Sequence, residues 1–257
     1  MDIASSLLAR RRVEVFAALA ACVLAWFIVA PHLPRVGLWP AIAIVSLAVM
    51  PGTLLLAYVA LPLWPRRSLV AAVIALALLA FLFTELDWGL AANFAKLWAA
   101  VFAGWAFLAL FEQLSWVVIV ACVIPLVDIV SVWRGPTHAI TSHHFGVYTA
   151  VAIAFLVPGG GAAYLGPPDV LFYALFLAAA ARWHLRVGWT WFAMTYMYGL
   201  TIVIANAAEV GGLPALPFLS AAFIAANPDL LWRAIRRSGD SSSSSLPSSS
   251  GDDPAPS

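Results

Sequence analysis

Residues 113–134 read QLSWVVIVACVIPLVDIVSVWR, an apolar stretch in which only Asp128 and Arg134 are charged. A helix needs about 20 such residues to cross the hydrocarbon core of a bilayer. The stretch therefore predicts a membrane-spanning helix that carries one acidic side chain inside the membrane. An ionisable group at that depth is costly, so Asp128 indicates a functional site.

The rest of the chain has the same apolar character. Of its 257 residues, 64% are hydrophobic and 10% are charged, whereas soluble domains are about 45–50% apolar and about 25% charged. The composition predicts an all-α polytopic membrane protein and argues against a soluble enzyme, a nucleic-acid binder or a disulfide scaffold. Hydropathy predicts eight spans, near 13–31, 37–62, 68–84, 89–111, 113–134, 166–182, 188–208 and 213–232. Pro51-Gly52 predicts a kink in the second span.

The two ends of the chain differ in kind. Residues 1–12 finish with three arginines and are expected to form a basic cytoplasmic N-terminus. The apolar run that follows exceeds the about 7–15 residues of a signal-peptide core, so it predicts an uncleaved first helix. Residues 238–257 are rich in Ser and Pro and predict a disordered tail. Between these ends we expect a four-helix membrane region at 13–111 and a second membrane region at 113–237.

Residues 147–157 are ambiguous, because eleven apolar residues are short for a span and suit a re-entrant or extended segment. Their β-branched side chains favour a strand. The positive-inside rule favours eight spans with both termini cytoplasmic, although nine is possible. Eight spans place ten of the 13 basic residues inside: Arg10, Arg11, Arg12, Arg66, Arg67, Arg182, Arg186, Arg233, Arg236 and Arg237. A ninth span at 147–157 would move the last five outside. The Arg-rich and Ala-rich composition suggests a prokaryotic plasma membrane.

Two acidic residues share a similar depth in the eight-span topology. Asp128 lies six residues, or about 9 Å, before the end of its outward-running helix. Asp169 lies three residues, or about 5 Å, beyond Gly166 at the start of an inward-running helix. If these helices are neighbours, the two carboxylates meet below the outer surface. Two carboxylates in a low-dielectric site share one proton, which is how aspartic proteases activate water.

The sequence around both aspartates resembles the presenilin and signal peptide peptidase family. LVDIVSV at 126–132 resembles the helix of the family's Tyr-Asp motif, and YLGPPDVLFY at 164–173 resembles its Gly-x-Gly-Asp helix. PALP at 214–217 matches the Pro-Ala-Leu motif, and FLVP at 155–158 resembles the stretch between the two Asp helices. The motifs occur in the family's order, and the resemblance covers about residues 113–232.

The resemblance implies a presenilin-like helix bundle that acts as an intramembrane aspartyl protease on transmembrane helical peptides. It implies Asp128 and Asp169 as the catalytic dyad and Gly166 as the first glycine of the Gly-x-Gly-Asp motif. It also implies the orientation of signal peptide peptidases and a substrate-facing edge formed by Pro214, Ala215 and Leu216. The expected partners are such peptides and the bilayer, with no nucleic acid, and the oligomeric state stays open.

Two residues depart from the family pattern. Val127 stands where the family has Tyr, and Pro168 stands where it has the second Gly. Proline fixes φ and removes an N–H, so this change could alter substrate choice or abolish activity. Two alternatives therefore stay open: a catalytically silent presenilin-like scaffold, and a proton-coupled transporter or channel that uses Asp128. Asp169 could also be a simple helix cap after two prolines.

The remaining candidate groups indicate no metal and no cofactor. Cys22 and Cys122 lie inside apolar runs, which is typical of packed or lipid-facing thiols. His138, His143 and His144 lack the spacing of a zinc site and predict a solvated loop.

Overall fold

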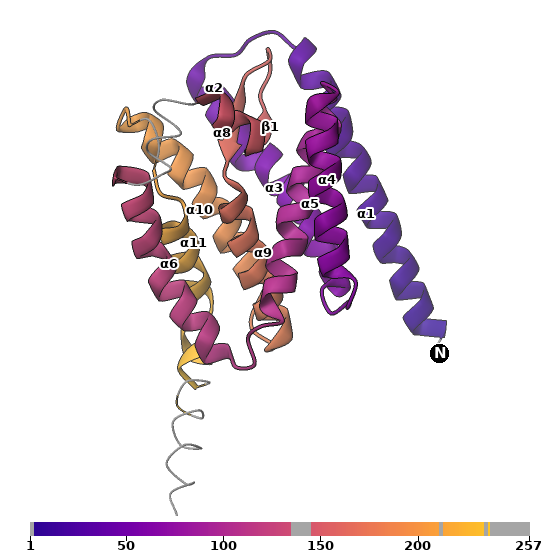
Figure 1. The fold of residues 1–257 in the computed structure, drawn as a ribbon, viewed down its shortest axis with the longest axis vertical. Coiled ribbons are helices and arrows are strands. Elements are labelled where there is room, and N and C mark those ends of the chain that lie inside the picture. The colour runs from indigo at the N-terminus through magenta and orange to yellow at the C-terminus, as the bar shows by residue number, and fades with distance from the viewer. Residues whose placement is uncertain (1–2, 135–144, 211–212, 234–235, 237–257) are drawn as a thin grey trace, which may run out of the picture.

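The computed structural model describes residues 3–134, 145–210, 213–233 and 236. The predicted histidine loop, at 135–144, and the predicted tail at 238–257 lie outside these residues. The helices run up and down side by side, and a small hairpin covers one end of them (Figure 1). The chain is a helical protein with several long apolar helices, as expected of a multi-pass membrane protein.

The N-terminal half contains α1 (Ile3–Val29), α2 (Leu38–Ile44), α3 (Met50–Val59), α4 (Leu69–Glu85) and α5 (Gly89–Leu108). The first helix begins ten residues before the predicted start, at Ile3 rather than 13, because no Pro or Gly interrupts residues 3–12. The arginines at 10–12 are thus part of α1. Short 3-10 turns at Ala30–His32 and Leu61–Leu63 end the first two helical segments.

A π-helical turn at Val45–Val49 joins α2 to α3. Pro51 lies two residues after this turn and has no N–H to donate to the carbonyl four residues earlier. Regular α-helical hydrogen bonding therefore fails in the turn before it. The irregularity thus lies one turn before the predicted Pro51-Gly52 position.

The C-terminal half contains α6 (Leu114–Arg134), α8 (Phe145–Val151), α9 (Pro167–Arg182), α10 (Val187–Ala207) and α11 (Leu216–Ala226). The last predicted span, 213–232, is not one helix, because α11 stops before Asn227 and helical structure resumes at 228–233. Asn227 leaves helical geometry, with φ −136° and ψ 32°.

Five helical segments in the described ranges are long and apolar enough to cross a membrane: Arg10–His32, Leu38–Leu63, Gly89–Leu108, Leu114–Val132 and Val187–Ala207. The apolar helices Leu69–Glu85 and Leu216–Ala226 are shorter. The count of eight spans stays a prediction. The start of α1 and the end of α11 lie at the same end of the molecule (Figure 1).

The central helix of the molecule is α9, which packs against α5, α10 and α11. Its residues from Tyr173 to Ala180 are fully buried. Gly104 of α5 makes the closest approach to it, because a Cβ there would collide with the main-chain carbonyl of Leu171. On another side, the rings of Phe176 and Phe223 stack with their centroids 4.8 Å apart. Small residues and interleaved rings thus let neighbouring helices approach α9 closely.

Residues 147–157 are only partly extended. The helix α8 occupies their first part, and β1 (Ile153–Leu156) pairs with β2 (Ala162–Leu165) in an antiparallel hairpin. The register places Ile153 opposite Leu165 and Leu156 opposite Ala162. Gly159 and Gly160 form the turn with φ of 84° and 87°, a conformation that glycine adopts without strain. The expected extended segment is therefore present at 153–156, whereas 145–151 is helical.

Side chains of α1 and α5 form hydrogen bonds with the edge of β1 that does not pair with β2. The Asn93 side chain of α5 donates to the carbonyl of Ala154 at 3.0 Å and accepts from its N–H at 2.7 Å. The indole N–H of Trp26 donates to the carbonyl of Leu156 at 3.0 Å. Polar backbone groups within a membrane need such partners. Because β2 leads directly into α9, these contacts also fix where α9 begins.

Candidate active site

Asp128 lies in the second half of α6 and is half-buried. Its Oδ2 accepts a hydrogen bond of 3.0 Å from the main-chain N–H of Leu216, at the first residue of α11. The N–H groups in the first turn of a helix have no partner within that helix, and a carboxylate is their best acceptor. Asp128 therefore caps a helix that begins 88 residues later in the chain.

Asp169 is the third residue of α9, after Pro167 and Pro168. Proline is favoured there because the first helical N–H groups need no intrahelical acceptor. The Oδ2 atom of Asp169 accepts a 3.0 Å hydrogen bond from the N–H of Gly166, the residue before the helix. The capping interpretation of Asp169 is thus correct, and the cap fixes the position of its carboxylate.

The two carboxyl groups lie on helices that contact each other. They come from neighbouring helices, since α6 contacts α9 and α11 packs against both. Each group uses only Oδ2 in its hydrogen bond to the main chain.

The Pro-Ala-Leu segment lies beside Asp128 and is buried at all three positions, Pro214, Ala215 and Leu216. Its observed contribution to the site is the main-chain N–H of Leu216. Val127, where the family has Tyr, is 57% exposed on the outside of α6. The structure therefore brings Asp128 to Leu216 and Asp169 to Gly166, and the helices that carry these pairs, α6, α9 and α11, contact one another.

Sequence reasoning missed Tyr198, which lies on α10 and is 1% exposed. Its hydroxyl donates to the main-chain carbonyl of Asp169 at 2.7 Å. A second tyrosine, Tyr173, shares a 2.9 Å hydrogen bond with Thr195 and packs 6.0 Å from the Tyr198 ring. Tyrosines are typical of span ends. A tyrosine in the middle of the predicted span 188–208 could therefore have been recognised as a candidate for a polar contact inside the bundle.

An apolar cavity of about 840 Å³ borders the start of α9. Pro167 and Pro168 line it at the position next to Asp169, and α4 and α5 supply the facing wall. Lys96 also lines it and donates to the carbonyls of Ala150 and Ala152 at 2.8 and 3.4 Å. An apolar surface of this kind suits a hydrophobic ligand.

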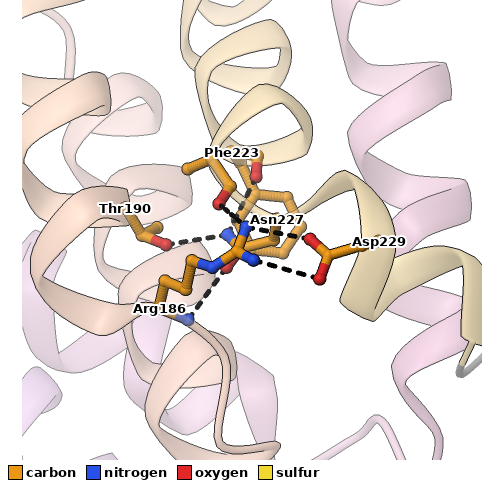
Figure 2. A network of polar contacts seen from close by, with 6 residues as sticks. Arg186, Thr190, Phe223, Asn227 and Asp229 are labelled. Atoms are coloured by element: carbon orange, nitrogen blue, oxygen red, sulfur yellow. Dashed lines mark hydrogen bonds and ion pairs between the residues drawn. The ribbon is translucent and has the colours of Figure 1, made fainter.

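The opposite end of α11 is held by a polar network (Figure 2). The buried Asn227 side chain donates to Thr190 at 2.8 Å and to the Phe223 carbonyl at 3.0 Å, and accepts from the Arg186 N–H at 2.9 Å. The guanidinium of Arg186 binds both carboxylate oxygens of Asp229, at 2.8 and 3.0 Å. This network joins α11 to α10 and so helps to set where the first turn of α11 meets Asp128.

No group of three or more His, Cys, Asp or Glu residues suited to a metal ion occurs in the described ranges. Comparisons of the chain with family models, with curated proteins and with solved structures find no match.

Proposed function

We propose that this protein is an intramembrane aspartyl protease of the presenilin and signal peptide peptidase type, which hydrolyses peptide bonds in transmembrane helices. One juxtaposition carries the proposal: Asp128 accepts the N–H of Leu216, and its helix α6 contacts α9, the helix that Asp169 caps. The three motifs that resemble that family thus lie on helices that contact one another, which supports the proposal. A helix cap alone would not require a second intramembrane carboxylate beside it.

In the proposed reaction, Asp128 and Asp169 share one proton and hold a water molecule between their Oδ1 atoms. The ionised carboxylate takes a proton from this water as its oxygen attacks the peptide carbonyl carbon. The protonated carboxyl donates a hydrogen bond to the developing oxyanion. Collapse of the tetrahedral intermediate breaks the C–N bond, and the amine leaves with a proton from the pair. The main-chain N–H bonds to each Oδ2 keep the two groups oriented.

The apolar cavity beside Pro168 offers a place for part of a hydrophobic substrate next to the dyad. We place the protein in the plasma membrane with eight spans and both termini in the cytoplasm. The charge pattern of the sequence supports this orientation, and the common position of the start of α1 and the end of α11 fits an even number of crossings (Figure 1).

The test is cleavage of a transmembrane peptide that contains a helix-breaking residue, with the full chain reconstituted in vesicles. We expect Asp128→Asn and Asp169→Asn each to abolish cleavage, because a carboxamide can neither take up the proton nor share it. Asp87→Asn is the matched control: Asp87 is exposed in the turn between α4 and α5 and has φ 56°, which Asn tolerates. Wild-type turnover in either dyad variant would disprove the mechanism.

A catalytically silent scaffold has one observation in its favour, which is that Asp169 already caps its own helix. This alternative predicts that the chain binds the transmembrane peptide without cleaving it, and that both dyad variants bind equally well. Measuring peptide binding by crosslinking alongside cleavage separates the two functions.

A further inference from the structure

A second cavity, of about 520 Å³, is lined by the first half of α1, a helix that starts at the opposite end of the molecule from the hairpin (Figure 1). Arg11 and Arg12 of α1 line one side of it, Tyr58 and Trp64 a second side, and Val187 at the start of α10 a third. Neither aspartate of the dyad and no residue of the Pro-Ala-Leu segment lines it. The cavity is therefore separate from the proposed active site.

The charges at this cavity have no counterpart in the described ranges. Arg10 forms an ion pair with Glu14 at 3.1 Å, but Arg11 and Arg12 make no ion pair with any described residue. The Tyr58 hydroxyl adds a polar group near the first turn of α10, since a Cβ on Gly188 would lie 3.9 Å from it. Two guanidinium groups, a hydroxyl and a helix N-terminus all favour an anion, and Arg matches the geometry of phosphate in particular.

The remaining wall is apolar, so an isolated inorganic anion would leave most of the cavity unfilled. Val15 and Val59 lie one turn or less along the helices from Arg12 and Tyr58, and Leu61 and Trp64 also line the cavity. A tryptophan beside arginines is typical of the level of lipid headgroups. Basic pockets between spans on the cytoplasmic side are suited to anionic lipids.

We propose that this cavity binds one anionic glycerophospholipid of the cytoplasmic leaflet. Arg11 and Arg12 hold its phosphate, Tyr58 donates to a phosphate oxygen, and the first part of an acyl chain lies along Val15 and Val59. Occupation joins α1 to α3 and to the start of α10, three elements that are far apart in sequence. This site goes beyond the proposed proteolysis and does not depend on it.

The test measures lipid binding by the full chain purified in neutral detergent, with phosphatidylglycerol and phosphatidylcholine as probes. Native mass spectrometry counts the bound lipid, and thermal unfolding reports its effect on stability. We expect one retained phosphatidylglycerol, a higher melting temperature with that lipid than with phosphatidylcholine, and binding about tenfold or more weaker in the variant Arg11→Gln/Arg12→Gln.

The matched control is Arg66→Gln/Arg67→Gln, which removes the same charge from the same end of the molecule but from residues that do not line the cavity. We expect it to bind phosphatidylglycerol like the wild type. Equal losses in the two double variants would overturn the proposal in favour of general surface attraction. Equal stabilisation by glycerol phosphate would also overturn it, because the acyl chain would then have no part in binding.

Discussion

At the residue scale, the candidate site is built on two carboxyl groups that cap helices and that the proposal also makes catalytic. Asp128 and Asp169 each accept a main-chain N–H at the start of a helix through Oδ2, and the proposed reaction uses the same two carboxyl groups. The two bonds explain how acidic side chains are tolerated inside an apolar bundle, because unpaired buried charges are strongly unfavourable. They also explain why helix capping and catalysis are compatible interpretations of Asp169.

A shared proton makes the proposed reaction sensitive to pH in both directions. When both carboxyl groups are protonated there is no base, and when both are ionised there is no acid, so cleavage should pass through a maximum. Initial rates of peptide cleavage in vesicles with the same buffer on both sides measure this profile. A rate that only rises with pH would contradict a shared-proton pair. Asp87→Asn serves as the control and should show the wild-type profile.

The second residue-scale prediction concerns Gly166→Ala. Gly166 has φ −67° and ψ 149°, which alanine adopts without strain, but the added Cβ would lie 3.1 Å from Oδ2 of Asp169. The carboxylate must move by a few tenths of an ångström, so turnover should fall about five- to tenfold with little loss of stability. Gly146→Ala, where the new Cβ meets nothing within 4 Å, should behave as wild type. Unchanged turnover in Gly166→Ala would show that the carboxylate position is not critical.

At the element scale, the hairpin and the contact between α5 and α9 determine where the site lies. The Asn93 side chain forms hydrogen bonds with the main chain of β1, and β1 pairs with β2. The strand β2 ends at the residue before Gly166. Sequence analysis could place Asn93 inside a span but could not identify its partner, because Ala154 lies 61 residues away. The hydrogen bonds to a strand edge exist only when the helices are assembled.

Close packing of α5 on α9 predicts that Gly104→Ala is destabilising. The new Cβ would collide with the carbonyl of Leu171 and lie 3.0 Å from the Cβ of Ala174, so the helices must separate. We expect a loss of about 1–3 kcal/mol in the free energy of unfolding, as for overpacked cores. Thermal unfolding in detergent measures it. Gly89→Ala in the same helix meets nothing within 4 Å and should leave stability unchanged. Equal melting temperatures for the two variants would contradict close contact at Gly104.

At the scale of the whole molecule, the number of crossings depends on the shorter apolar helices. The helix α4 has 17 residues, or about 26 Å at 1.5 Å per residue, which is close to the about 30 Å of a hydrocarbon core. Eight spans require α4 to cross, and they place the turn with Arg67 inside and the turn with Leu86 outside.

Cysteine accessibility tests this topology in cells, on a background in which Cys22 and Cys122 are replaced by alanine. We expect a membrane-impermeant thiol reagent to label Leu86→Cys in intact cells and to label Arg67→Cys only after lysis. Both residues are exposed at the ends of α4, so access is not limited by packing. Labelling of both in intact cells would show that α4 does not cross, and the count of eight would be wrong.

The sequence by itself determined that the chain is a helical membrane protein, because apolar runs of spanning length lead to this outcome whatever their arrangement. It also singled out Asp128 and Asp169, since intramembrane charge is rare and costly. Most helix ends followed from local breakers, and Pro228 marks the break at Asn227 in the same way, although one unbroken span was predicted over 213–232. The start of α1 did not follow, because no Pro or Gly marks it.

Only the tertiary structure decided which groups meet. Leu216 donates to Asp128 across 88 residues and Tyr198 donates to Asp169 across 29. The basic cavity likewise combines α1, α3 and the start of α10. Local sequence governs the formation of each helix through hydropathy and backbone hydrogen bonding. The partners of a polar group inside the bundle depend instead on how whole helices pack, which no local pattern records.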